Sequence, residues 1–442
     1  MSVRRLLLPG LLVLASACAT TPKPGPGPGS EPKAAALAPS EAKPQAAAKA
    51  PEKAPAPSEK APAEKKAEPS ADLLSVAQRT ELTAAESSFA TQTERRPKDD
   101  AAWTNLGIVQ ERQGKNDEAE RAYRQALELK PEQQAAWDNL TRLQCRTGRA
   151  AQAETQLREV LQARPDALAP RTALVLALLC QKKHDAAASE AKRVLKSDER
   201  NVRAMQLLAQ VYYRERKLEL AKMVLDNARA IAPDEAATHN ALGLVQLALG
   251  TKPAALESFQ KAAALKPDFA EARNNLGALL NEAQDPAAAV RELEAAVQAA
   301  PDFVSARLNL GNAYRGQGDF ARALAEYQQV LRLAPGLPDT YFNLAILHLD
   351  AEPEGLDPIT RLQSSLSYFE QYRAKGGRDE RLDVYVKDAR KGIEKEERRR
   401  EREKRDQLRK AQKAESPTQD SPQAAPPAPA ASGSGRVAED KK

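Results

Sequence analysis

The side chains that most often carry out chemistry are few in this sequence and lie far apart. Its 442 residues include three histidines and three cysteines. His184, His239 and His348 do not have the spacing of metal ligands, and no Ser/His/Asp or Cys/His set can be assembled around one site. Gly311 and Gly316 have the spacing of a phosphate-binding loop, but the Lys-Ser/Thr pair that completes such a loop is missing. We therefore expect no enzyme: no catalytic residues, no metal site and no cofactor.

Asparagine is the polar residue whose spacing is most informative. Asn105, Asn139, Asn275, Asn309 and Asn343 all fall in one phase of 34 residues. A side-chain amide both donates and accepts hydrogen bonds, so a row of them can hold the backbone of an extended peptide. Asparagines at such a position can equally satisfy polar groups of the protein itself. Both interpretations require one structural unit that repeats along the chain.

The 34-residue period runs through the centre of the chain and does not depend on the asparagines. Prolines share one phase of it at Pro97, Pro131, Pro165, Pro233, Pro267, Pro301 and Pro335, with Glu199 in the remaining place. In seven successive units, the first of which begins at Asp100 and the last of which ends at Leu337, position 7 is always leucine and position 20 is always alanine. A period of this length is typical of stacked arrays of short helical units.

Each unit must fold into elements that place these residues on one face. The apolar spacing predicts two antiparallel helices, helix A over about positions 2 to 14 and helix B over about positions 18 to 31. A small residue at position 8 lets the two helices approach closely, and proline after helix B ends it. Pro253 and Pro286 fall at the start of helix B, where a missing N–H is harmless, and Asp285 can cap that helix.

The repeated unit resembles the tetratricopeptide repeat. Its fullest match lies in the first unit, at Trp103, Leu106, Gly107, Ala119, Tyr123, Ala126 and Pro131. The resemblance implies an all-α superhelix, an α-solenoid of helix-turn-helix repeats, with a concave groove lined by the A helices. It also implies that positions 2, 5, 9, 12 and 13 of helix A face a protein ligand, and that asparagines at position 6 can contribute.

On this resemblance, the predicted partner-binding groove contains the five asparagines named above and four arginines. The arginines are Arg142, Arg146, Arg203 and Arg214, which together suit an acidic segment of a partner. The lysine and asparagine arrangement of the chaperone carboxylate clamp is missing, so we do not expect recognition of a free C-terminus. The net charge of +6 is small for a chain of this length, and we expect no nucleic acid partner.

The unit from Leu168 to Asn201 departs most from the repeat pattern. Arg171 replaces the aromatic residue at position 4, Val175 replaces glycine at position 8, and proline is missing at position 32. Because valine keeps helix B at a distance, we expect wider helix spacing or a shifted register in this unit. The unit is a flexible joint, a partner site or a product of ordinary repeat drift.

Two of the cysteines, Cys145 and Cys180, occupy positions 12 and 13 of adjacent units. Neighbouring A helices are expected to lie about 10 Å apart, which is too far for comfortable disulfide geometry. We therefore expect two free, partly buried thiols.

The N-terminus, MSVRRLLLPGLLVLASACAT, has the layout of a secretion signal. Two arginines precede an apolar run, which is too short to span a bilayer, and small residues precede Cys18. This arrangement resembles a bacterial lipoprotein signal, which implies that Cys18 carries lipid and attaches the protein to a membrane. The alternative is an ordinary secretory signal with a coincidental cysteine. Since Ala19 is not aspartate, the resemblance implies sorting to the outer membrane.

Composition and period divide the chain into segments. They are residues 1–17, a signal peptide; 18–70, the lipidated cysteine and a disordered Pro/Ala/Lys linker; 71–99, a degenerate capping repeat; 100–337, seven repeats; 338–377, an eighth repeat with an insertion; 378–413, a charged helix; and 414–442, a disordered tail. The charged helix is either a solvated helix, a basic arm for anionic polymers or a helix that pairs with a partner.

Together these features predict an outer-membrane-anchored scaffold in the periplasm that binds protein partners of an envelope-spanning assembly. The layout resembles the lipoproteins of surface-motility machines, particularly the gliding-motility type, and more distantly the lipoproteins of type IV pilus and secretin assembly. A cell-wall or polysaccharide-associated adaptor is an alternative of a different class.

Overall fold

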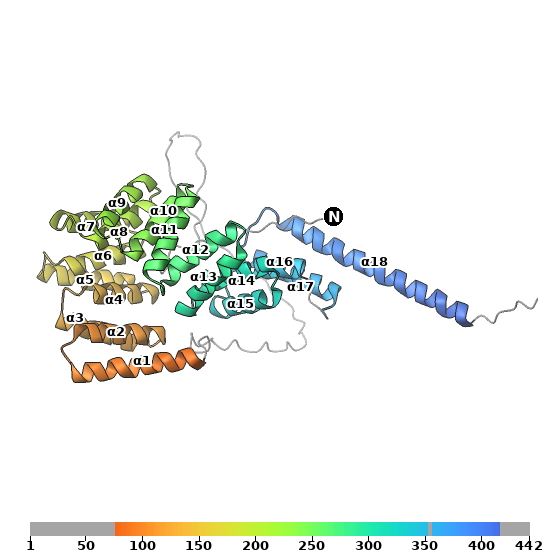
Figure 1. Cartoon of the computed structure of the whole chain (residues 1–442), viewed down its shortest axis with the longest axis horizontal. Coiled ribbons are helices and arrows are strands. Elements are labelled where there is room, and N and C mark those ends of the chain that lie inside the picture. Colours follow the sequence, from red (N-terminus) through yellow and green to blue (C-terminus); the bar gives the residue numbers. More distant parts are fainter. Residues whose placement is uncertain (1–75, 352–355, 416–442) are drawn as a thin grey trace, which may run out of the picture.

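The computed structural model describes residues 76–351 and 356–415, which form 18 α-helices and no strand (Figure 1). The helices are α1 (Val76–Arg95), α2 (Asp100–Arg112), α3 (Asn116–Leu129), α4 (Gln134–Arg146), α5 (Ala150–Ala163), α6 (Leu168–Cys180), α7 (His184–Ser197), α8 (Val202–Arg214), α9 (Leu218–Ile231), α10 (Ala236–Ala248), α11 (Lys252–Leu265), α12 (Ala270–Glu282), α13 (Pro286–Ala299), α14 (Val304–Gln317), α15 (Phe320–Leu333), α16 (Pro338–Asp350), α17 (Pro358–Ala374) and α18 (Leu382–Glu415). The predicted signal peptide, Cys18 and the linker lie outside the described residues.

From α2 to α17 the helices form antiparallel pairs, in which an even-numbered helix A is followed by an odd-numbered helix B. We number these pairs as units one to eight. Each unit packs on the next, so the array is elongated and its core continues from one unit to the next, while α18 extends away from the last unit (Figure 1). The all-α solenoid predicted from the period is therefore confirmed.

The residue at position 8 controls how closely the two helices of a unit approach. It is glycine in units one, five, six and seven, where a side chain of helix B lies directly against the glycine. A Cβ atom built on Gly107, Gly243, Gly277 or Gly311 would lie only 2.5 to 2.6 Å from Tyr123, Phe259, Leu293 or Tyr327, respectively. Helices A and B make more extensive contacts in these four units than in units two to four. Glycine is therefore required here by packing, because no other residue leaves room for the facing side chain.

Units two to four have larger residues at position 8 and no aromatic ring opposite them. The facing residues at positions 8 and 24 are Thr141 with Leu157, Val175 with Ala191, and Ala209 with Leu225. In unit three, α6 and α7 pack less closely than the helices of the glycine units, and in unit two α4 and α5 are the least closely packed. The wider spacing expected from Val175 is present, and it is greater still at Thr141.

A hydrogen bond from position 4 links each unit to the one before it. The side chains of Trp103, Trp137, Arg171, His239, Arg273, Arg307 and Tyr341 all donate to the carbonyl oxygen of the proline six residues earlier. Arg171 therefore makes the same hydrogen bond as the tryptophans at position 4 of units one and two. The exception is Met205, which has no polar hydrogen to donate and follows the single place where Glu199 stands instead of proline.

Two prolines within the repeats lie at helix starts, as predicted. Pro253 lies in the first turn of α11 and Pro286 is the first residue of α13. The Asp285 side chain caps α13 by accepting a hydrogen bond of 3.0 Å from the backbone N–H of Ala288.

The C-terminal end of the array is closed by α18. Phe342 of α16 and Phe369 of α17 form an aromatic cluster with Tyr385 of α18, with ring centroids 5.9 to 6.0 Å apart. Leu382 and Ala389 of α18 are also buried, so the first turns of this helix act as a cap. Within the described ranges, none of the helices combines the length and apolarity needed to cross a lipid bilayer.

Candidate partner-binding groove

A pocket of about 350 Å³ opens on the face formed by the A helices of units two to six. Its walls come from α4, α6, α8, α10 and α12, and the turn before α12 closes one end. The residues of helix A that line it include Arg203, Ala237 and Glu271 at position 2, Gln206 and Asn240 at position 5, Arg142, Leu176, Gln210 and Leu244 at position 9, Tyr213 at position 12 and Cys180 at position 13. The pocket thus lies where the resemblance placed ligand contacts.

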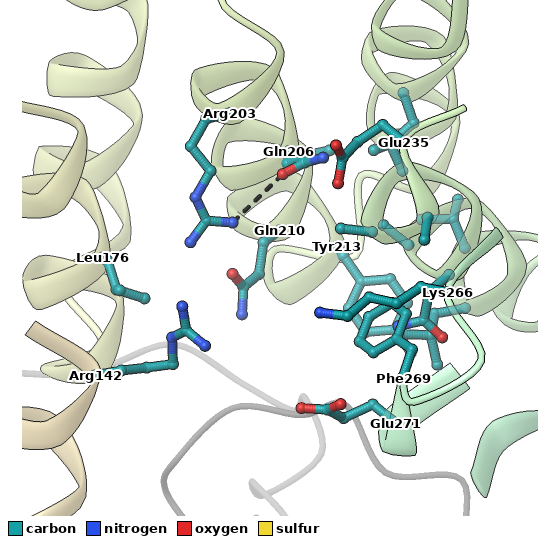
Figure 2. Close-up of a pocket in the computed structure, with 18 of the residues that line it drawn as sticks. Arg142, Leu176, Arg203, Gln206, Gln210, Tyr213, Glu235, Lys266, Phe269 and Glu271 are labelled. Carbon is teal, nitrogen blue, oxygen red and sulfur yellow. Dashed lines mark hydrogen bonds between the residues drawn. The ribbon is translucent and has the colours of Figure 1, made fainter. Parts of the chain in front are cut away.

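Polar side chains from three separate elements point into this pocket. Figure 2 shows Arg142 of α4, Gln210 of α8 and Lys266 of the turn before α12 directed toward the same open space. The guanidinium of Arg142 donates only to the side-chain oxygen of Asn139, at 3.2 Å, and it forms no ion pair with any described residue. Its positive charge is therefore not neutralised by the protein.

Arg203 is held more firmly than Arg142. Its Nε lies 2.8 Å from Oδ2 of Asp138, a buried carboxylate of α4, in an ion pair that bridges α8 and α4. Its Nη1 donates at 3.4 Å to Oε1 of Gln206, whose own amide donates at 2.9 Å to Thr238 of α10. Arg203 therefore forms a fixed part of the pocket wall, and much of its charge is compensated.

The other two predicted arginines lie outside this pocket. Arg146 is exposed at the end of α4 and pairs with Glu111 of unit one at 3.2 Å, and it also donates to Asn116. Arg214 is exposed at the end of α8. The four arginines predicted as one basic patch are thus divided, with Arg142 and Arg203 in the pocket and the other two beside it.

The predicted row of asparagines behaves differently in the two halves of the array. Asn105 is exposed and Asn139 is partly buried, whereas Asn275, Asn309 and Asn343 are buried. Asn309 donates at 2.9 Å to Asn274, which donates at 3.3 Å to Asn275, and Asn275 donates at 3.0 Å to Asn240. This chain of side-chain hydrogen bonds connects α14, α12 and α10. For Asn275 and Asn309, the structure supports the interpretation that the amides satisfy polar groups of the protein itself.

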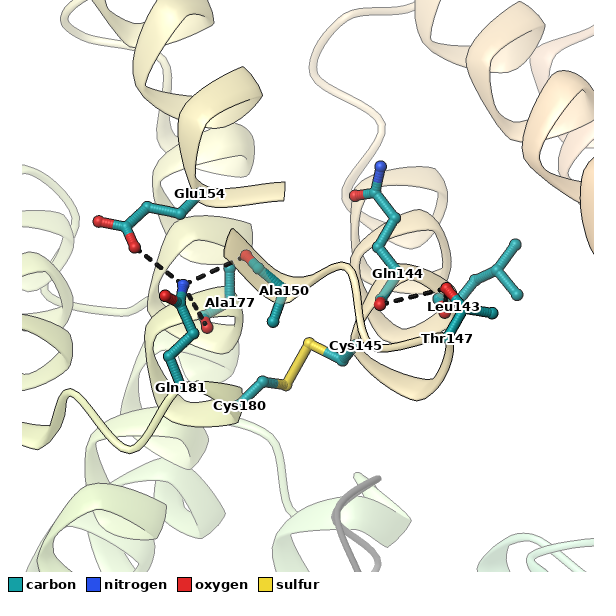
Figure 3. Close-up of a disulfide and its surroundings, with 9 residues drawn as sticks. All are labelled: Leu143, Gln144, Cys145, Thr147, Ala150, Glu154, Ala177, Cys180 and Gln181. Carbon is teal, nitrogen blue, oxygen red and sulfur yellow. Dashed lines mark hydrogen bonds between the residues drawn. A yellow bond between two sulfur atoms is a disulfide. The ribbon is translucent and has the colours of Figure 1, made fainter. Parts of the chain in front are cut away.

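Cys145 and Cys180 form a disulfide that joins the end of α4 to the end of α6, with Cα atoms 6.0 Å apart (Figure 3). The prediction of two free thiols is wrong because it assumed ordinary spacing between neighbouring A helices. Thr141 and Val175 keep α5 and α7 away from their A helices, and α4 packs on α6 more extensively than any other two neighbouring A helices pack on each other. Because Cys180 also lines the pocket, the disulfide fixes one of its walls.

A partly buried carboxylate on α5 also holds units two and three together. Oε2 of Glu154 on α5 accepts a hydrogen bond from Gln181 at 2.8 Å (Figure 3). It also accepts one from Lys183 at 2.7 Å, and the two bonds hold the turn between α6 and α7 against α5. Desolvation by burial favours the protonated form of Glu154, but the hydrogen bonds from Lys183, Gln181 and Arg158 outweigh it and lower the pKa of the carboxyl to about 2. Glu154 is therefore ionised at neutral pH.

Some residues that line the pocket were not among those predicted. Gln206 and Gln210 occupy positions 5 and 9, so the repeat register was sufficient to find them. Lys266 and Phe269 lie in the turn between two units, with the Lys266 ammonium 5.6 Å from the Phe269 ring centroid, and a scheme based only on helix A positions omits them. Across the described part of the chain, no three His, Cys, Asp or Glu side chains are grouped to hold a metal ion.

Comparisons with known proteins address the fold. Two models of the tetratricopeptide repeat family match the chain, one over residues 101–133 and the other over 207–270, 240–302 and 279–338. A crystal structure of the APC/C hetero-tetramer Cut9-Hcn1 superposes with a TM-score of 0.56 at 16% sequence identity. That match covers 70% of this chain and 59% of the other chain, so this chain spans less than two thirds of that protein.

Two shorter proteins also match part of the array. MamA is 24% identical over 37% of this chain and 92% of its own, with a TM-score of 0.31. YrrB, described as a TPR protein with an unusual peptide-binding site, is 20% identical over 40% of this chain and 92% of its own, also with a TM-score of 0.31. A search of curated protein sequences finds no significant match.

At these identities, the structural likeness concerns the fold alone. The family models cover unit one and most of the array from α8 to the start of α16, and the helix pairs between them keep the same 34-residue register. The chain is therefore an α-solenoid that carries tetratricopeptide repeats, the architecture of protein–protein interaction scaffolds.

Proposed function

We propose that this protein is a scaffold that holds an extended, acidic segment of a partner protein in the pocket formed by α4, α6, α8, α10 and α12. One observation carries the proposal: the uncompensated charge of Arg142 and the amide of Gln210 converge on one open space (Figure 2). Gln210 makes no hydrogen bond with any other described residue, so its donors and acceptor are available to a ligand backbone.

The walls of the pocket define the chemistry of the segment further. Leu176 and Leu244 provide apolar surface from α6 and α10, and Tyr213 lies between them on α8. A segment that places one carboxylate near Arg142 and one apolar side chain near Leu244 satisfies both kinds of wall. Glu235 and Glu271 also line the pocket, and their negative charges oppose a segment that is acidic along its whole length.

We also propose the cellular setting in which this scaffold acts. Cys18 would carry lipid and hold the protein at the outer membrane, facing the periplasm, with the linker giving the array reach. The assembly served would be an envelope-spanning machine for gliding or surface motility. This setting is supported only by the resemblance of the leader sequence and the overall layout. Type IV pilus or secretin assembly and attachment to the cell wall are the competing settings.

Photo-crosslinking in cells tests the pocket directly. Probes at Ala237 and Ala241 lie in the pocket without replacing a side chain that the proposal uses, and a control probe at Met223 lies on the exposed surface of helix B, where this side chain is 55% exposed. We expect one dominant protein to be captured from the pocket probes and not from the control, with the crosslinked peptide of that protein containing at least one Asp or Glu. Arg142→Glu should abolish that capture. Arg214→Glu makes the same charge change on an exposed arginine outside the pocket and should leave capture intact.

The same experiment can refute the proposal. Equal loss with both arginine variants would mean that general electrostatics, and not this pocket, attracts the partner. Capture of wall fragments alone would favour the cell-wall adaptor. The setting is tested separately by mass spectrometry of the peptide that contains Cys18 and by fractionation of a Cys18→Ser variant, which should lose the outer-membrane fraction if Cys18 is the lipid attachment site.

A further inference from the structure

One face of α18 carries a continuous row of basic side chains. The row consists of Lys387, Lys391, Lys395, Arg398, Arg402, Arg405 and Arg409, all of them exposed. They follow one another at intervals of four or three residues, so on an α-helix they lie within about 40° of a common direction and extend over about 33 Å. The seven charges therefore form a straight line and not a scattered basic surface.

The row is largely free of ion pairs, although the helix as a whole contains many. Arg399 and Arg400, which lie on other faces, pair with Glu396, and Arg400 also pairs with Asp357. Within the row only Arg398 has a partner, Glu394, at 3.5 Å. The other six residues form no ion pair with any described residue. Their charges are thus available to an external anion.

The other side of the helix is fixed to the solenoid. Leu382 and Ala389 are buried against the last unit, and a Cβ atom on Gly392 would lie 2.8 Å from Leu362 of α17. The contact between Arg400 and Asp357 extends this attachment to the middle of α18. The helix continues straight beyond that point, away from the array (Figure 1). The row is therefore presented in a fixed direction relative to the repeats.

Part of the row also borders an open cleft. Lys391, Lys395, Arg398 and Arg402 line this cleft, which has a volume of about 960 Å³, together with the carboxylates Glu394, Glu396, Glu403 and Asp406 and with Leu356 and Pro358 near the start of α17. No described part of the chain covers the four basic side chains, which are all exposed.

We propose that this basic row binds the flat surface of a lipid bilayer that contains anionic headgroups. A straight row on a straight helix touches a plane along its whole length, so all seven charges can approach such a surface together. Leu408 is the only large apolar side chain exposed on the part of α18 that projects beyond Arg400, at 62% exposure. The contact is therefore electrostatic and peripheral, without the apolar face that insertion into the bilayer requires.

Nucleic acid fits this surface less well. No aromatic residue lies between Lys387 and Arg409, so the helix lacks the stacking platforms that bind single strands. Asp388 and Asp406 flank the row on one side and Glu394 flanks it on the other. A helix that enters a groove of a duplex has phosphates along both flanks, which these carboxylates would repel, whereas a plane meets the row itself first.

A pair of matched variants tests the geometry of the row. The first is Lys391→Gln with Lys395→Gln and Arg402→Gln, all within the row. The second is Arg390→Gln with Lys404→Gln and Lys410→Gln, which removes the same number of lysines and arginines from other faces of the same helix. None of these six residues forms an ion pair within the described structure, and glutamine has a helix propensity close to that of lysine and arginine. Circular dichroism should show equal helix content in both.

Binding is measured by co-sedimentation of the full chain with vesicles of equal parts phosphatidylglycerol and phosphatidylcholine. Every variant also carries Cys18→Ser, so any lipid on that residue cannot contribute, and the result is independent of the proposed pocket and anchor. Basic residues near an anionic surface contribute about fivefold each to binding. The row variant should therefore bind about 100-fold more weakly than the parent, and the control variant should lose much less.

Four outcomes would overturn the proposal. They are equal loss in the two variants, equal binding to vesicles of phosphatidylcholine alone, binding that does not weaken as salt is raised, and tighter binding to duplex DNA or to an acidic protein than to the anionic vesicles. The expected result is binding that requires phosphatidylglycerol, weakens with salt and depends on the row.

Discussion

The A helices of units two to four and those of units five to seven occupy equivalent places in the solenoid, yet they treat the same positions differently. In the later units, positions 5 and 6 hold asparagines that are buried and hydrogen-bonded from unit to unit. At position 9, Asn312 of unit seven is also buried and accepts a hydrogen bond of 2.8 Å from Tyr327, whereas Gln210 of unit four lines the open pocket. A polar residue at a given register position is therefore part of the core in one half and part of a binding surface in the other.

The packing within each unit explains much of this difference. Where position 8 is glycine, as at Gly277 and Gly311, helix B approaches closely, and in units six and seven the A helices are linked by asparagines. Where position 8 is Thr141 or Val175, helix B lies further away and α4 packs on α6 instead. The size of one residue thus changes which helices are neighbours, and register alone does not determine exposure.

Removal of the disulfide should have the largest effect on this comparison. The bond joins residues 35 apart in sequence. A loop of that size corresponds to about 4 kcal/mol of stabilisation in the chain-entropy description. We expect Cys145→Ala with Cys180→Ala to lower the urea midpoint of the transition that includes units two and three, and reductant to have the same effect on the parent only. Identical midpoints for the oxidised parent and the double variant would show that packing alone holds α4 on α6.

Gly311→Ala should damage the close approach in unit seven. The new Cβ would lie 2.5 Å from the fully buried ring of Tyr327. Overpacking of this kind costs about 1 to 3 kcal/mol, which is measurable by urea unfolding. Adding Tyr327→Leu recreates the combination that occurs naturally at Ala209 and Leu225, so the double variant should lose less than the sum of the two single variants. Simple additivity would contradict the link between positions 8 and 24.

Asn309→Ala should show whether the asparagine chain stabilises the later units. It removes the donor to the buried side-chain oxygen of Asn274, a loss of about 1 to 2 kcal/mol when an acceptor is left unsatisfied. Asn105→Ala is the matched control, because it changes the same register position where the side chain is exposed. Thermal unfolding should distinguish the two variants. If both variants lowered the melting temperature by a similar small amount, the buried asparagines would contribute no more to stability than the exposed one.

The smallest effect should come from Glu154 and should depend on pH. Its pKa is lowered from 4.5 to about 2 in the folded protein. A lowered folded-state pKa contributes stability above the unfolded pKa, and this contribution is lost as the pH falls from about 4.5 toward 2. Glu154→Gln should lower the melting temperature by a few degrees at neutral pH and flatten its fall over that acid range. Glu159→Gln, an exposed change on the same helix, should leave the acid dependence of the parent unchanged.

Most of the fold could be predicted from sequence because each unit repeats the same pattern of residues, which acts locally. Leucine at position 7, alanine at position 20 and proline at position 32 specify two helices and a stop without reference to distant residues. The link from position 4 to the preceding proline was also present in the sequence. All seven donors at position 4 are polar or aromatic. The one residue there that cannot donate, Met205, follows the one unit among the first seven without proline at position 32, so the link is found only when positions 4 and 32 are compared.

The pocket and the disulfide could be predicted only in part. Arg142 and Arg203, which the helix positions singled out, line the pocket, but Lys266 enters from a turn that no helix register describes. The disulfide depends on the distance between α4 and α6, which results from the residues at position 8 in two different units. Burial of Asn309 depends on how three successive A helices are arranged. Each of these properties belongs to several units at once, and the pattern within one unit does not contain it.

The paired sizes at positions 8 and 24 also limit how this gene can change by recombination. Because the repeats have equal length, recombination between two of them at equivalent positions keeps both the reading frame and the repeat register. An exchange that joins α6 to α15 would place Val175 against Tyr327, whereas the reciprocal product would face Gly311 with Ala191 and leave a void. Exchange of whole units is expected to disturb packing less than exchange of half units, because the matched residues at positions 8 and 24 then stay in the same unit.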